Sequence, residues 1–161
     1  MNKKYERYIN YIVNDIKPPY FINMKDNYGL RSDEYELVLS NLYDQPVTIK
    51  GNYVYDSNGN EIYLENSDGY WIKKEYDEYG YLNYYEDSTG FWYKREYDFK
   101  GNNLYSENSN GNWVKREFDS NGNEIYFEDS DGYWVKKEYN TNGNIIYRED
   151  SDGIIRDRRY E

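Results

Sequence analysis

The chain of 161 residues contains no cysteine, no histidine and no alanine. Lacking the first two, it cannot form disulfides, thiol nucleophiles, zinc sites of the usual kind, a histidine general base or a Ser-His-Asp triad. No apolar run approaches the roughly 18 residues of a membrane helix. The basic start Met1–Arg7 is not followed by an apolar segment, so the sequence predicts no signal peptide and a soluble cytoplasmic protein.

Acidic residues outnumber basic ones by 31 to 20, which gives a net charge of −11. The excess lies in residues 51–153, where 22 acidic and 10 basic residues occur. An acidic chain is a poor candidate for binding nucleic acid or anionic lipid directly. The charge therefore favours a protein partner with a basic surface and no membrane.

The second feature is an internal repeat with a step of 21 residues. Two turn signals recur in each unit, and the segments between them are short and rich in Tyr, Trp, Ile and Val. Such segments are typical of strands joined by hairpin turns, because Asn, Asp and Gly tolerate positive φ. The recurring structural residues are Trp71, Trp92, Trp113, Trp134, Gly59, Gly80, Gly101 and Gly122.

Five such units predict a mainly β fold, an elongated antiparallel meander of two-stranded repeats. Residues 47–161 form this hairpin array, whose units start at about residue 56. Residues 1–46 are nearly neutral and predict a helical cap. One helix is indicated by apolar spacing from Tyr5 to Ile16, and a second begins at Ser32 and stops at Gln45-Pro46. We expect this cap to cover one open edge of the sheet.

The pattern Tyr55-Asp56-x-x-Gly59-Asn60, followed by Asp68-Gly69, resembles the YD repeat of RHS-type proteins. The resemblance covers roughly 105 of the 161 residues and implies hairpin strands. RHS proteins use very long arrays to build closed shells around a toxin, and five units cannot close such a shell. A short acidic array with a small helical region also resembles small accessory proteins encoded by bacteriophages. A further likeness is to aromatic hairpin repeats that bind cell-wall choline.

Candidate sites are judged by their repetition. Five copies of one Glu favour a structural ladder over a glycosidase pair, so no catalytic residue and no enzyme activity are predicted. In Asp56-Ser57-Asn58-Gly59-Asn60 the glycine stands at position 4, not at position 6 as in a calcium loop. We therefore predict no metal and no cofactor. The Lys-Lys and Lys-Arg pairs are each followed by Glu, which indicates neutralising ladders.

The remaining hypothesis is a non-enzymatic binding protein. The first choice is a phage-type inhibitor, anti-CRISPR or anti-restriction, which occupies a basic nucleic-acid-binding surface of a bacterial defence nuclease or its guide complex in the host cytoplasm. The alternatives are an assembly module that forms homo-oligomers through sheet edges or the helical cap, and a glycan-binding repeat. The residues predicted to bind the partner are Asp56, Asp77, Asp98, Asp119, Glu65, Glu86, Glu107 and Glu128.

Overall fold

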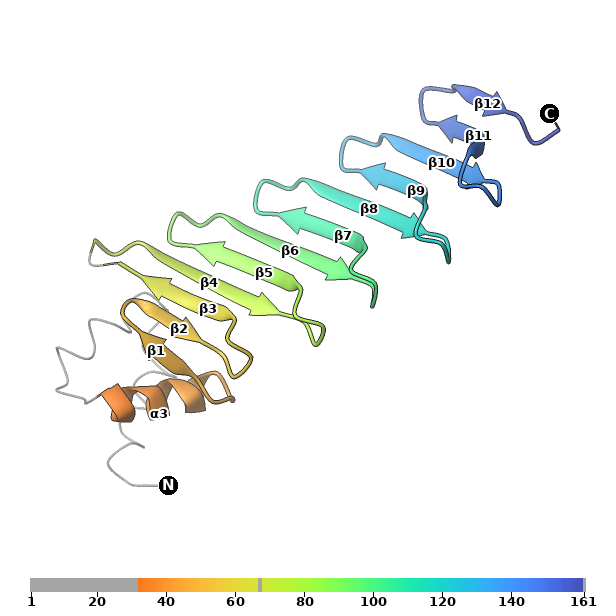
Figure 1. Cartoon of the computed structure of the whole chain (residues 1–161). Coiled ribbons are helices and arrows are strands. Elements are labelled where there is room, and N and C mark those ends of the chain that lie inside the picture. The colour runs from red at the N-terminus through yellow and green to blue at the C-terminus, as the bar shows by residue number, and fades with distance from the viewer. Residues whose placement is uncertain (1–31, 67, 161) are drawn as a thin grey trace. The chain divides into compact units, whose positions relative to one another are not determined.

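The computed structural model describes residues 32–66 and 68–160. These residues form one helix, α3 (Ser32–Leu42), and twelve strands (Figure 1). The strands are β1 (Thr48–Lys50), β2 (Tyr53–Tyr55), β3 (Glu61–Glu65), β4 (Trp71–Tyr76), β5 (Leu82–Asp87), β6 (Trp92–Tyr97), β7 (Asn103–Asn108), β8 (Trp113–Phe118), β9 (Glu124–Asp129), β10 (Trp134–Tyr139), β11 (Ile145–Asp150) and β12 (Ile155–Asp157).

The strands follow one another in the sheet in chain order, from β1 to β12. The predicted mainly β meander of two-stranded repeats is therefore confirmed, and its elongation stays a prediction. The second predicted helix is present, and the first lies outside the described residues. Within the described part of the chain, no helix is long and apolar enough to cross a membrane.

The chain divides into two compact units. Unit 1 comprises residues 1–76 and 85–90, and unit 2 comprises residues 77–84 and 91–161. The two parts of β5 thus belong to different units. The predicted boundary between residues 46 and 47 stays a prediction.

The buried apolar cluster of unit 1 lies between α3 and the first strands. Its members are Val38, Leu39, Val47, Val54, Ile62 and Tyr63. Helix α3 also satisfies backbone groups of the edge strand β1 and of Val47, which precedes it. The amide N–H of Val47 donates to Ser40 Oγ (3.1 Å), and the amide N–H of Ile49 donates to Glu36 Oε1 (2.9 Å). Side chains of the helix thereby occupy donors that a bare edge would offer to another strand.

The strands of unit 2 present two faces. On β6, Trp92, Lys94 and Glu96 alternate with Tyr93, Arg95 and Tyr97. Tyr105 pairs with Glu96 on one side and with Lys115 on the other. One apolar side chain of the described part of unit 2, Val135, is buried. This part of the sheet is therefore stabilised mainly by half-buried cross-strand pairs.

The hairpin turns follow one geometry. In the turn that begins at Asp98, the amide of Gly101 donates to the carbonyl oxygen of Asp98 (3.0 Å), and φ of Gly101 is +86°. Hairpin loops in which a type I turn is followed by a left-handed residue have this arrangement. Among the described residues, only glycines and Asp44 have positive φ.

Candidate functional site

The aspartates predicted to bind a partner hold their own turns. Asp98 Oδ1 accepts hydrogen bonds from the amides of Lys100 and Asn102 (both 2.9 Å), and Oδ2 accepts one from Asn102 Nδ2 (2.8 Å). These bonds, the Asn102 side chain first, lower the pKa of Asp98, and Asn123 does the same for Asp119. Asp56 makes equivalent bonds and is 9% exposed, and Asp77 Oδ1 accepts from the amides of Tyr79 and Tyr81.

The predicted glutamates accept hydrogen bonds from tyrosines on their own strands. The hydroxyl of Tyr105 donates to Glu107 Oε2 (3.2 Å), and that of Tyr126 donates to Glu128 Oε2 (3.1 Å). In unit 1, Tyr63 donates to Glu65, which is 1% exposed. In repeat two, the hydroxyl of Tyr85 donates to Asp87 Oδ2 (3.2 Å). Burial and the glutamate acceptor raise the pKa of Tyr105.

A third set of acids is more exposed. Glu96, Glu117 and Glu138, here called the acidic column, take the same place on β6, β8 and β10 and are exposed. Equivalent positions lie two strands apart, about 9.6 Å. Sequence reasoning did not single out this set. Its 21-residue spacing, together with its place two residues after Lys on the same face, was the available signal.

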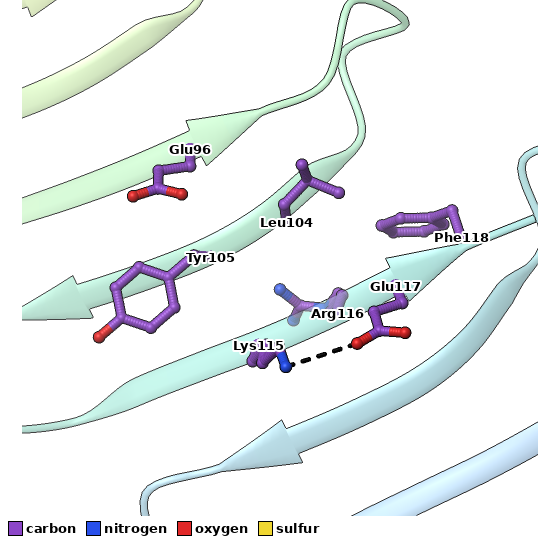
Figure 2. Close-up of a pocket in the computed structure, with 7 residues that line it drawn as sticks. All are labelled: Glu96, Leu104, Tyr105, Lys115, Arg116, Glu117 and Phe118. Carbon is purple, nitrogen blue, oxygen red and sulfur yellow. Dashed lines mark ion pairs between the residues drawn. The ribbon is translucent and has the colours of Figure 1, made fainter.

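Two members of the acidic column line one depression on this face, with a volume of about 550 Å³. Figure 2 shows Glu96 on β6, Tyr105 and Leu104 on β7, and Lys115, Glu117 and Phe118 on β8. Lys115 Nζ lies 3.4 Å from Glu117 Oε1. The depression is open and combines carboxylates with an aromatic ring, so it suits polar contact with another surface.

The basic residues pair with acids of the same sheet. Lys137 Nζ lies 2.8 Å from Glu124 Oε1, and Arg159 Nη1 lies 3.2 Å from Glu138 Oε1. In unit 1, Lys73 and Glu75 are 2.6 Å apart. These ion pairs agree with the interpretation of the Lys and Arg pairs as neutralising ladders.

The tryptophans are half-buried on the strand face and not fully buried. Lys94 Nζ lies 5.4 Å from the ring centroid of Trp92, and Lys136 Nζ lies 5.1 Å from that of Trp134. The backbone carbonyl oxygen of Trp113 accepts a hydrogen bond from the amide of Ser130 (2.9 Å), which lies in a turn of the following repeat. The tryptophan positions thus link successive repeats within unit 2.

No group of three or more acidic side chains within the described residues is arranged to hold a metal ion. The turn carboxylates explain this result, because their oxygens are directed at backbone amides of their own loops.

No protein-family model matches the chain, and no curated protein matches its sequence. Solved structures do match, among them a Photorhabdus luminescens Tc holotoxin pore (19% identity, TM-score 0.47, 72% of this chain). A crystal structure of TcdB2-TccC3-TEV matches with 18% identity and a TM-score of 0.47 over 63% of this chain. One of TcdB2-TccC3-Cdc42 matches with 17% identity and a TM-score of 0.45 over 69% of this chain. The chain spans about 6% of the length of each. The likeness is at low sequence identity and covers part of this chain.

Proposed function

We propose that the chain is a non-enzymatic binding protein whose acidic column docks on a basic surface of a partner protein. The observation that supports this proposal is the exposure of Glu96, Glu117 and Glu138 at one repeated place on the strand face. The turn aspartates and the tyrosine-bonded glutamates are less exposed than the acidic column, whose members Glu117 and Glu138 stay exposed although they pair with Lys115 and Arg159. The acidic column therefore replaces them as the principal contact. A catalytic site is a single asymmetric pocket, whereas these acids recur in successive repeats.

The partner of this proposal is a nucleic-acid-binding surface of a bacterial defence nuclease, a CRISPR effector or a restriction enzyme, and the chain acts as a phage-type inhibitor. Basic grooves that bind phosphates also attract regularly spaced carboxylates. The negative charges of the acidic column are about 9.6 Å apart. This spacing is much wider than that of the phosphate charges of duplex DNA, which carries about one charge per 1.7 Å. We therefore expect the acids to guide association and other contacts to add affinity.

The test is a panel of purified CRISPR effectors and restriction enzymes, each cleaving its own plasmid with and without this protein. Inhibition of one member, relieved by added salt, is the expected result. Glu117→Gln with Glu138→Gln should slow association and flatten the salt dependence. The matched control is Asp131→Asn with Asp152→Asn, which removes the same charge from exposed turn positions where repeat three has Asn110.

Equal losses from both pairs would mean that only net charge matters. A panel in which no nuclease is inhibited would refute the inhibitor proposal.

The second candidate function is an assembly module. All three residues of β12 are exposed, and Ile155 is 61% exposed, whereas α3 occupies donors of β1. Sedimentation at high salt separates the two functions, because a strand-edge oligomer persists where an electrostatic complex dissociates.

A further inference from the structure

Comparison of equivalent turn positions in the five repeats shows which residues the hairpin itself requires. The first turn of each unit begins at an Asp or Asn and ends at a glycine three residues later. In three units the two residues between them are small or polar: Ser57-Asn58, Ser120-Asn121 and Thr141-Asn142. Two turns depart from this pattern, Glu78-Tyr79 and Phe99-Lys100. Both belong to unit 2. A departure confined to two turns is not required by the hairpin, because the other turns close without it.

Both departures expose an aromatic ring. Tyr79 is 57% exposed, and Phe99 is 70% exposed. Exposed rings at turn tips contribute little to folding, since stability comes from apolar area removed from water. At interfaces, however, aromatic residues are the side chains that most often carry binding energy. We name Tyr79 and Phe99 the aromatic tips.

Beside Tyr79 lies a depression of about 440 Å³. Three carboxylates and one guanidinium line it, those of Asp77, Glu78, Glu96 and Arg95. Asn83 also lines it, at a place where the other repeats have Ile or Leu. Its Oδ1 is buried and accepts no hydrogen bond from the described residues. An unpartnered buried amide oxygen is costly to folding, so Asn83 is a further departure that the fold itself does not favour.

The two turns are joined by Tyr81, which replaces the Asn found in the other repeats. A Cβ atom at Gly101 would lie 2.7 Å from the Tyr81 hydroxyl, and the Tyr81 ring lies 5.2 Å from that of Tyr97. Tyr81 therefore packs against the turn that carries Phe99. This contact holds the aromatic tips on a supported surface and not on independent loops.

We propose that the aromatic tips and the carboxylates beside them form a patch that binds arginine side chains of a partner protein. The inference rests on the proposed function and specifies which basic residue is recognised. Arginine stacks on aromatic faces and pairs with carboxylates, and lysine does the first less well. The sheet already uses this contact internally, since the guanidinium carbon of Arg95 lies 4.3 Å from the Tyr93 ring centroid and that of Arg159 lies 4.2 Å from the Tyr147 centroid.

The test uses two labelled peptides, one of nine arginines and one of nine lysines, and measures their affinities by fluorescence anisotropy. Wild-type protein should bind the arginine peptide about tenfold more tightly. Tyr79→Asn with Phe99→Ser restores residues that stand in equivalent turns, so its thermal stability should equal or exceed that of the wild type. In this variant the two peptides should bind with nearly equal affinity.

The control Ile145→Asn removes an exposed apolar side chain outside the patch, where repeat three has Asn103, and should keep the arginine preference. Glu117→Gln with Glu138→Gln should weaken both peptides alike and leave their ratio unchanged. Equal binding of both peptides to the wild type, or a preference that survives Tyr79→Asn with Phe99→Ser, overturns the arginine patch while leaving the proposed function intact. Binding of neither peptide overturns both.

Discussion

At the scale of single residues, the turn aspartates show how a carboxylate that is only half-buried at a hairpin can still be bound into the fold. Asp98 and Asp119 accept hydrogen bonds from backbone amides of their own turns. In the turn that begins at Asn140, the side-chain Oδ1 of this residue accepts hydrogen bonds from the amides of Asn142 and Asn144 (both 3.0 Å). The backbone geometry therefore needs an oxygen acceptor at this place and not a charge.

Acid sensitivity follows from these turns. Hydrogen bonds lower the pKa of Asp98 and Asp119, and Arg159 lowers that of Asp157 to about 2. A carboxyl whose pKa is lower in the folded state stabilises the fold above its unfolded pKa of about 4, and that contribution is lost as the pH falls through the folded value. We expect the urea concentration at the midpoint of unfolding to decrease when the pH is lowered below about 4. Asp98→Asn with Asp119→Asn should keep the fold and reduce this fall; an unchanged fall would contradict the assignment.

Asn83 gives a second prediction at this scale. The equivalent position of the next repeat is Leu104. The substitution Asn83→Leu therefore removes a buried amide oxygen that has no hydrogen-bond partner among the described residues. The free energy of unfolding should rise by about 1–3 kcal/mol, measured by urea titration. As a control, Leu104→Asn should lower it. A loss of stability in Asn83→Leu would show that the amide has a role in the fold.

At the scale of elements, α3 serves as both core and edge cover. Glu36→Ala removes the acceptor of the Ile49 amide and should lower the free energy of unfolding by about 1–3 kcal/mol. It should also increase self-association, because the edge of β1 gains an open donor. Urea titration and sedimentation measure the two effects. Leu37→Ala, an exposed position on the same helix (46%), should change neither.

The sequence predicted the elements well because both hairpin signals recur with one step. It placed β3 to β12, and it placed α3 from its cap and apolar spacing. It did not predict the direction of the carboxylates. Asp98 and Glu96 are both acids near one turn, yet Asp98 bonds inward and Glu96 is exposed. Composition and spacing do not distinguish these cases, since the difference depends on turn geometry and on which strand face the residue occupies.

At the scale of the whole molecule, burial is unevenly distributed. The apolar cluster of six buried residues lies in unit 1, whereas the described part of unit 2 buries Val135 alone among its apolar side chains. In repeat proteins each repeat is stabilised mainly by its neighbours. We infer that unit 1 is the more stable part.

Hydrogen exchange tests this inference. Amides of β2 and β3, beside the buried cluster, should exchange more slowly than those of β10 and β11. Exchange measured by mass spectrometry on the intact chain gives the comparison. Slower exchange in β10 and β11 would mean that cross-strand pairs stabilise the sheet more than the apolar cluster does.

The self-contained closure of each turn has a consequence for how such a chain changes over time. The acceptor and the glycine that close a loop are separated by two positions that contribute a backbone amide to the closure, as Ser120-Asn121 and Phe99-Lys100 both show. New residue pairs can therefore arise at those positions without disturbing folding. Duplication of a 21-residue unit would supply another pair, so a lineage can acquire new binding preferences by single substitutions at the tips while the strands remain under constant selection.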